Sequence, residues 1–329
     1  MIRGLVLGKF MPFHAGHIAL IEFALLNTDL LIVVVCANSK EPITGATRYH
    51  WLKNYYQHHL AVQVQLVEYD ETKLSASSVS SKESAEKWAG YLKEHFSGID
   101  LFISSEPYGE WVAEYWGIKH LCFDLERSRI PVSATAIREN PFKYWSYIPQ
   151  IVRPYYVKKI CIAGSESTGK SVLTERLANY YKTVFVSEMA RNIIDTTAEC
   201  TIADLYAIAS AHANTIIEKT AFANKLLFVD TDITITSSYA AFLFGTTINT
   251  ADWVNEANRF DLYLFLETDC AYVQDGTRLN ESDRELLNMS HKKEFARKGI
   301  GYHIIRGDWE QRFSTAIGII NNFFFENKA

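Results

Sequence analysis

The stretch "VKKICIAGSESTGKSVLTERLANYY", residues 157–181, decides the fold of the second half of this 329-residue chain. An apolar run that ends at Ala163 predicts a β-strand, and the apolar spacing after Lys170 predicts a helix. Between them, "GSESTGKS" at 164–171 matches G-x-x-x-x-G-K-[ST], the pattern of a phosphate-binding loop, in the strand-loop-helix context that the pattern requires. A chance glycine-rich turn is the alternative. We therefore expect a nucleoside triphosphate site here.

Each part of this loop has a chemical purpose. Backbone N–H groups of the loop and of the helix N-terminus would face the phosphates. Lys170 would place a positive charge on the β and γ phosphates, and Ser171 would offer a hydroxyl to Mg²⁺. The residues expected to bind this ATP are Gly164, Ser167, Thr168, Gly169 and Ser171.

Carboxylates follow two further predicted strands. "FVDTD" ends an apolar run with Asp230 and Asp232, where a carboxylate can serve Mg²⁺, a substrate or a reacting hydroxyl. Aspartates that cap a turn are the alternative. "FVSEMAR" predicts Glu188 and Arg191 on one face at the start of a helix, with Glu188 holding a ribose hydroxyl or accepting its proton; an ordinary ion pair is the alternative. The sequence leaves open which of these three carboxylates is the general base.

The segment "YVQDGTRLNESDR", residues 272–284, predicts a loop after the strand "DLYLFLE". In a small-molecule kinase, such a loop is expected to be a lid whose arginines cover the transferring phosphoryl group and exclude water. Arg278 is the strongest candidate, with Asp275, Asp283 and Arg284 in the same loop. A solvated charge cluster is the alternative.

Near the start of the chain, "GKFMPFHAGH" at residues 8–17 places His14 and His17 after the apolar run "LVL". A zinc site would need a third ligand, and none with suitable spacing stands nearby. Two histidines that flank a glycine at a strand-to-helix turn are also badly placed for core packing. Phosphate binding at the helix N-terminus is the interpretation that remains.

The predicted elements alternate between strand and helix twice. Continuous apolar runs such as "LLIVVVCA" at 30–37 are typical of parallel strands buried on both faces. Three prolines and many aromatic residues lie between the halves, so we place the boundary near Pro154, with domains 1–154 and 155–329. The expected fold class is α/β, with two doubly wound parallel-sheet domains.

Composition limits the functional classes. A net charge of −5 gives no bulk attraction to nucleic acid or to an anionic membrane. No run is long and apolar enough to span a bilayer, and the start of the chain does not resemble a signal peptide, so we expect a cytoplasmic protein. The cysteines form no C-x-x-C pair and fit reduced thiols, with three expected in the core: Cys36, Cys122 and Cys161.

Two signatures in the first half resemble the nucleotidyltransferase superfamily. The first is G-x-F-x-P-x-H-x-G-H, filled by Gly8, Phe10, Pro12, His14, Gly16 and His17. The second is "VSATAIREN" at 132–140, similar to I-S-S-T-x-x-R, with Ala134 where many members carry serine. The resemblance implies a Rossmann-like domain in which the histidines, Gly8, Phe10 and Gly16, together with Ser133, Thr135 and Arg138, surround ATP.

The order of the two halves resembles the bifunctional nicotinamide mononucleotide adenylyltransferase and ribosylnicotinamide kinase family. "SSEPYGEW", "RIPVSATAIRENPFKYWSYIPQIVRPY", "GSESTGKS", "DTD" and "VQDGTR" carry this resemblance over nearly the whole chain. It implies that the P-loop kinase half phosphorylates nicotinamide riboside with ATP and Mg²⁺, and that the first half joins the mononucleotide (NMN) to AMP, which gives NAD and pyrophosphate. The candidate substrate-binding residues are Trp88, Asp232, Arg191 and Asp275.

Two rivals stay open at this point. One is a phosphopantetheine adenylyltransferase fused to a dephospho-coenzyme A kinase, and the other is a sensor that binds pyridine nucleotides and has one weak active site. Some relatives carry a helix-turn-helix segment ahead of the first domain, whereas here the first strand begins within the first few residues, so we expect no DNA binding. The sequence does not decide whether the chain forms a homo-oligomer.

Overall fold

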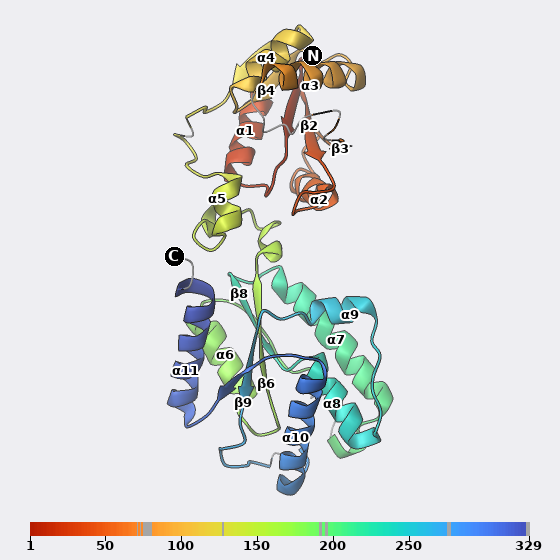
Figure 1. Cartoon of the computed structure of the whole chain (residues 1–329), viewed down its shortest axis with the longest axis vertical. Helices are drawn as coiled ribbons and strands as arrows, with labels where there is room; N and C mark the ends of the chain where they lie inside the picture. Colours follow the sequence, from red (N-terminus) through yellow and green to blue (C-terminus); the bar gives the residue numbers. More distant parts are fainter. Residues whose placement is uncertain are drawn as a thin grey trace. The chain divides into compact units, whose positions relative to one another are not determined.

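The computed structural model describes residues 1–70, 72, 74, 81–126, 128–190, 193–194, 197–274 and 278–326. The chain divides into two compact units, Met1–Tyr155 and Tyr156–Ala329, each with its own sheet (Figure 1). In each unit, helices alternate with parallel strands along the described chain. The doubly wound α/β fold that the sequence predicts for both halves is confirmed.

The first unit is built on a parallel sheet with the strand order β3-β2-β1-β4-β5. Its strands are β1 (Arg3–Gly8), β2 (Leu30–Ala37), β3 (Val62–Glu68), β4 (Leu101–Ser104) and β5 (Lys119–Cys122). The helices are α1 (Ala15–Leu25), α2 (Gly45–Tyr55), α3 (Lys82–His95), α4 (Tyr108–Trp116) and α5 (Ala134–Glu139), followed by the short 3₁₀ turns η1 (Trp145–Tyr147) and η2 (Arg153–Tyr155). Because β1 lies at the centre, the segment that follows it starts from the middle of one sheet edge.

A core on one face of this sheet corrects one site prediction. Helices α3 and α4 pack there, with Trp88 and Val112 against strand residues such as Leu5 and Phe102. The Trp88 side chain is 0% exposed, so the prediction that it binds substrate is wrong. Its place on the apolar stripe of the amphipathic helix α3 is the physical reason.

The cysteine predictions are confirmed in part. Cys36 and Cys161 are buried on central strands, whereas Cys122 is exposed. Cys122 ends β5, which is the edge strand of its sheet and has no fully buried residue. An apolar run therefore overstates burial where a strand lies at a sheet edge.

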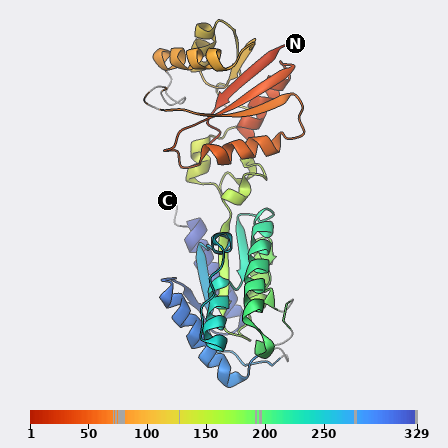
Figure 2. The ribbon, with the colours of Figure 1, turned by 90° about the vertical axis from the view of Figure 1, so that its right-hand side faces the viewer.

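The second unit has a parallel sheet with the order β10-β9-β6-β8-β7. The strands are β6 (Lys158–Gly164), β7 (Phe185–Val186), β8 (Leu226–Asp230), β9 (Leu262–Leu266) and β10 (His303–Ile305). The helices are α6 (Lys170–Tyr180), α7 (Ile202–Thr220), α8 (Ile233–Phe244), α9 (Asp252–Ala257), α10 (Glu281–Arg297) and α11 (Trp309–Asn321), with a 3₁₀ turn η4 (Thr197–Glu199) and a π-helical turn η5 (Asn322–Glu326). Figure 2 shows helices on both sides of these strands.

The register of this sheet positions the functional residues. Every residue of β8 and β9 is buried, as expected for central parallel strands covered on both faces. Strand β6 pairs with β8 so that Ile162 lies beside Asp230. The loop that begins at Gly164 and the carboxylate of Asp230 therefore leave the same edge of the sheet. In the described part of the chain, no helix is long and apolar enough to cross a bilayer.

Candidate functional site

The loop after β6 adopts a conformation that depends on its two glycines. Gly164 has φ 144° and Gly169 has φ 85°, both in the region that favours glycine. A Cβ at Gly164 would lie 2.7 Å from the Leu266 carbonyl oxygen, and one at Gly169 would lie 2.3 Å from the Trp309 ring. The loop is thus closely packed on its outer side, and α6 begins directly after it at Lys170.

Two buried arginines hold the backbone of this loop. Arg284 donates from Nε to the Glu166 carbonyl at 3.1 Å and from Nη2 to the Ser167 carbonyl at 3.3 Å. Arg312 donates from Nη1 to the Thr168 carbonyl at 2.6 Å. Because the C=O and N–H of one planar peptide point in opposite directions, carbonyls held on the outside turn the following N–H groups inwards. The loop is therefore pre-arranged to bind an anion.

Side chains of the loop and of the first turn of α6 complete this arrangement. Thr168 and Lys170 donate to the Ser165 carbonyl at 2.8 and 3.0 Å. Ser171 donates from Oγ to Oδ2 of the buried Asp230 at 2.5 Å. The structure thus brings together Lys170, Ser171 and Asp230, which the sequence predicts for the phosphates and the metal ion. The Thr168 hydroxyl is used inside the loop, so only the backbone of Thr168 remains for a ligand.

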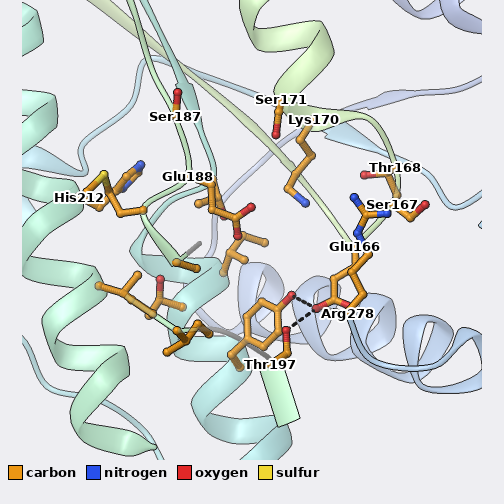
Figure 3. Close-up of a pocket in the computed structure, with 18 of the residues that line it drawn as sticks. Glu166, Ser167, Thr168, Lys170, Ser171, Ser187, Glu188, Thr197, His212 and Arg278 are labelled. Atoms are coloured by element: carbon orange, nitrogen blue, oxygen red, sulfur yellow. Dashed lines mark hydrogen bonds between the residues drawn. The ribbon is translucent and has the colours of Figure 1, made fainter. Parts of the chain in front are cut away.

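A cavity of about 490 Å³ opens in front of the loop, a volume that suits a small-molecule ligand (Figure 3). Its polar lining residues include Lys170, Glu188, Tyr239 and Arg278, while Met189, Ile194, Leu205 and Ile208 supply apolar surface. Figure 3 shows the Glu188 and Lys170 side chains extending into the same space. A carboxylate therefore shares one cavity with the phosphate loop.

Glu166, an acidic residue inside the phosphate loop, joins several walls of this cavity. Its carboxylate accepts hydrogen bonds from the Thr197 and Tyr239 hydroxyls, both at 3.1 Å, and from the Leu279 N–H at 2.9 Å. The first two are drawn in Figure 3. Burial raises the pKa of Tyr239 well above its ordinary value, so its hydroxyl stays protonated and donates. This role of Glu166 could not be predicted from the sequence, because the loop pattern accepts any residue at this position.

The segment with Arg278 is attached to the phosphate loop on both sides. The Val273 N–H donates to Ser167 Oγ at 2.8 Å, and the Leu279 N–H donates to Glu166. Arg278 donates to the Val273 carbonyl and lines the cavity. The Ser167 hydroxyl is therefore occupied by this segment.

Two residues expected in the arginine loop lie in α10 instead. Asp283 and Arg284 belong to the first turns of that helix, and Arg284 is 4% exposed. The prediction that Arg284 sits in a lid is wrong, because the helix starts at Glu281, with Asn280 as its cap. Asp275 lies outside the described residues.

Asp232, predicted to bind substrate, has a structural role. It caps α8 by accepting from the N–H groups of Thr234 and Ile235, both at 3.0 Å, and it accepts from the Tyr263 hydroxyl at 3.2 Å. Burial raises its pKa, although these hydrogen bonds act in the opposite direction. Its side chain is 1% exposed and does not line the cavity, so the substrate-binding prediction is wrong and the capping alternative holds.

The helix predicted after "FVS" does not form where expected. Strand β7 ends at Val186, and the next α-helix in the described chain starts at Ile202. Glu188 therefore lies on an irregular segment that lines the cavity. Arg191, its predicted partner, lies outside the described residues.

In the first unit, the two predicted histidines lie at the N-terminus of α1. His14 caps the helix, with Nδ1 accepting from the Gly16 N–H at 3.0 Å, and its ring centre lies 3.9 Å from that of His17. The zinc alternative gains no support from this geometry, since one His14 nitrogen already accepts a backbone hydrogen bond. Among the described residues, no group of three or more His, Cys, Asp or Glu side chains could hold a metal ion.

Phe10 has a different place from the one predicted. The sequence predicts it among the ATP-binding residues, but its ring is 1% exposed and packs edge-on against His17, with ring centres 4.9 Å apart. A Cβ at Gly8 would lie 3.1 Å from this ring, so Gly8 makes room for it. Direct contact of Phe10 with ATP is therefore wrong, and the ring instead buttresses His17.

The second signature of the first unit meets the first one in space. Ser133 caps α5 by accepting from the Ala136 N–H at 3.1 Å. Arg138 donates to the Met11 carbonyl, inside the histidine signature, and to Thr135 Oγ1 at 3.0 Å. Residues 127 positions apart in the sequence thus contribute to one polar site beside the N-termini of α1 and α5.

A buried charge cluster beside this site has no counterpart in the sequence predictions. Glu41 pairs with Lys9 at 2.9 Å and with the fully buried Arg48 at 2.5 Å. Burial opposes both charges, but the hydrogen bond between them raises the pKa of Lys9 and lowers that of Glu41. Arg48 also donates to the Lys9 carbonyl at 2.6 Å, so the cluster holds the start of the histidine signature in place.

Comparison with known proteins agrees with this division into two sites. A family model described as cytidylyltransferase-like matches residues 5–140, and one described as an AAA domain matches residues 159–312. The trifunctional NAD biosynthesis/regulator protein NadR of Salmonella typhimurium is 29% identical over 350 residues, covering 98% of this chain and 83% of that protein. The chain is homologous to NadR.

The NadR of Escherichia coli is 28% identical and aligns with 99% of this chain and 84% of its own length. A crystal structure of NadR in complex with NR shares the fold, with a TM-score of 0.80 at 22% identity and coverage of 98% of this chain and 96% of that one. The family resemblance carried by the sequence motifs is thereby confirmed.

Proposed function

We propose that this NadR homologue is a bifunctional enzyme of NAD biosynthesis. The second unit phosphorylates the 5′-hydroxyl of nicotinamide riboside with ATP, and the first unit transfers an adenylyl group from ATP to the resulting mononucleotide. The observation that carries this proposal is that each unit has its own phosphate-type site at a helix N-terminus, in a chain that aligns with NadR over 98% of its length. Solved NadR structures contain NR in one case, and NAD with AMP-PNP in another.

In the second unit, the chemistry is phosphoryl transfer. The inward N–H groups of the loop and Lys170 would bind the triphosphate, and Arg278 would stabilise charge on the transferred group. The riboside hydroxyl must lose its proton as its oxygen bonds to the γ-phosphorus. We assign the proton acceptor to Glu188, because it lines the cavity with Lys170, whereas Asp230 already accepts from Ser171 and Asp232 caps α8.

The residues for a magnesium ion fit the chemistry that it requires. Ser171 Oγ and the Asp230 carboxylate are hard oxygen donors, 2.5 Å apart at the edge of the phosphate loop. They would hold Mg²⁺, which neutralises phosphate charge when bound. Asp230 is fixed for this purpose by its buried position at the end of β8.

In the first unit, the proposed reaction needs no general base. An ionised phosphate oxygen of the mononucleotide attacks the α-phosphorus of ATP, and the bond to pyrophosphate breaks. His14, His17 and Arg138 would stabilise the charge that builds on the leaving pyrophosphate. Ser133 and Thr135 lie at the start of α5, beside Arg138, where they can contact the same triphosphate.

The proposal is tested by supplying ATP and Mg²⁺ with nicotinamide riboside, nicotinamide mononucleotide or phosphopantetheine in separate reactions. We expect mononucleotide from the first, NAD and pyrophosphate from the second, and no product from the third. Adenylyl transfer to phosphopantetheine alone would instead support a coenzyme A pathway enzyme. Binding of the pyridine compounds without turnover would support a sensor.

Two variants separate the sites. Lys170→Ala should reduce riboside phosphorylation by about a hundredfold or more, since it removes a charge that acts on the transferred group, and should leave adenylyl transfer unchanged. His17→Ala should have the reverse effect. Lys219→Ala, an exposed lysine on α7, is the matched control and should change neither rate. Loss of both activities in Lys170→Ala would contradict the assignment of two separate sites.

A further inference from the structure

Arg284 is a buried arginine that lies against the outer side of the phosphate loop. Its side chain is 4% exposed, and its donors go to the carbonyls of Glu166 and Ser167 and, at 3.2 Å, to the carbonyl of Cys270. The Ser165 hydroxyl in turn donates to the Arg284 carbonyl at 3.1 Å, which ties α10 to the loop. Arg284 thus contacts three consecutive residues of the loop, Ser165–Ser167.

The charge of Arg284 has no carboxylate partner among the residues that the structure describes. Its guanidinium contacts carbonyls, the Cys270 sulfur and, at 5.7 Å, the face of the Tyr272 ring. The nearby Glu166 carboxylate is occupied by Thr197, Tyr239 and Leu279. Arg312, the other arginine on this loop, differs because it pairs with Asp269.

The position of Arg284 adds to the cost of burying it. A guanidinium that leaves water without a carboxylate partner is strongly penalised. Arg284 also lies in the first turns of α10, where the positive end of the helix dipole opposes a cation. An anion bound by the inward N–H groups of the loop would offset both costs, because Arg284 donates to carbonyls of the same loop.

We propose that Arg284 is a positioning residue of the phosphate site whose unpaired charge is balanced by the triphosphate bound across the loop. The guanidinium orients the loop carbonyls outwards, and its charge attracts the ligand without contacting it. This inference rests on the proposed function of the second unit as an ATP-dependent kinase. It differs from that function by assigning part of the ATP affinity to a residue behind the loop.

Two substitutions separate the charge from the hydrogen-bonding fork. Arg284→Gln removes the charge and keeps a donor, whereas Arg284→Lys keeps the charge and loses the planar fork. We expect Arg284→Gln to weaken ATP binding by about tenfold or more and Arg284→Lys by only about threefold, with the difference shrinking at high salt. Arg259→Gln, an exposed arginine of the same unit, removes an equal charge from the surface and should leave the affinity unchanged.

The measurement is the dissociation constant of ATP with Mg²⁺, by titration calorimetry on the full chain at two salt concentrations. Lys170→Ala gives the background from the first unit, and thermal unfolding of each variant shows whether its second unit is folded. Equal losses in Arg284→Lys and Arg284→Gln would overturn the role of the charge, as would wild-type affinity in Arg284→Gln. If Arg284→Gln does not fold, Arg284→Lys alone decides, since a tenfold loss there would leave only a structural role.

The test also distinguishes failure of the proposed function. If the wild-type protein shows no ATP binding beyond the Lys170→Ala background, the assignment of the loop to ATP is wrong, and the role of Arg284 fails with it. If wild-type binding is clear and the Arg284 variants do not follow the expected order, only the inference about Arg284 fails.

Discussion

Asp230 and Asp232 lie two positions apart at the end of β8 and have different roles. Asp230 accepts from Ser171, at the edge of the phosphate loop, and Asp232 caps α8 and accepts from Tyr263. Side chains two positions apart lie on the same face only while the chain continues as a strand. Strand β8 ends at Asp230, so the spacing of two does not ensure that Asp232 shares its role. Contacts decide the role of each carboxylate.

The buried Trp88 provides a test of the distinction between core and site. Trp88→Ala should lower the free energy of unfolding of the first unit by about 3–5 kcal/mol, because it leaves a large cavity between α3 and the sheet. The KM for the mononucleotide should stay within about twofold of the wild-type value. Denaturant titration and steady-state kinetics measure these two quantities.

Trp111→Ala is the matched control for this prediction, since Trp111 packs only partly against the same cluster. It should cost clearly less stability than Trp88→Ala. A rise of tenfold or more in the KM for the mononucleotide of a folded Trp88→Ala protein would indicate that Trp88 contributes to substrate binding.

The sequence predicted those site residues that belong to a local pattern. Lys170, Ser171, His14 and His17 stand within ten residues of a strand end, and a glycine at a fixed offset identifies each pair. Arg284 and Arg312 are more than a hundred positions from the loop that they hold, and an isolated arginine has no pattern of its own. Such residues become visible only when the folded chain brings the segments together.

At the scale of elements, burial and strand order explain which predictions held. Central strands such as β2 and β8 were predictable because parallel strands covered on both faces are continuously apolar. Edge strands were less so: β7 has only two residues, and β5 exposes Cys122. The sequence predicts a helix at Glu188, where the structure has an irregular segment. The spacing of residues along the sequence contains no information on the tertiary contacts that keep this segment from forming a helix.

Helices α7 and α10 each bury a histidine, which makes the second unit sensitive to acid. Burial lowers the pKa of His212 to about 4, and burial followed by the charge of Lys170 lowers that of His291 to about 3. Both are neutral in the fold but gain a proton more readily when unfolded, near an ordinary pKa of about 6.5. Their contribution to the free energy of unfolding is therefore fully present above the unfolded-state pKa of about 6.5 and is lost as the pH falls towards 4.

We expect the free energy of unfolding of the second unit to fall by about 2 kcal/mol per histidine between pH 7 and pH 5. Denaturant titrations at the two pH values measure this change. His291→Gln should remove about half of it, whereas His303→Gln, at an exposed position on β10, should leave it intact. An unchanged pH dependence in both His212→Gln and His291→Gln would contradict the prediction.

At the scale of the whole molecule, each unit has an apolar core of its own. One cluster joins α3, α4 and the first sheet, while two others lie entirely within the second unit, around α7 to α9 and around β9 with α10. The two proposed sites likewise draw on separate residues. A substitution in one core should therefore change the stability of one unit only.

Scanning calorimetry of the full chain should resolve two unfolding transitions, and two variants should assign them. Asp232→Ala removes the cap of α8 and leaves the Tyr263 hydroxyl without its acceptor, at a cost of about 2–4 kcal/mol, and should lower one transition by about 5–15 °C. Trp88→Ala should lower the other. ATP added with Mg²⁺ should raise both transitions, because each unit is proposed to bind ATP and a ligand stabilises the unit that binds it. Lys170→Ala should abolish only the rise of the transition that Asp232→Ala lowers. A single transition that moves with both substitutions would show that the two cores unfold together.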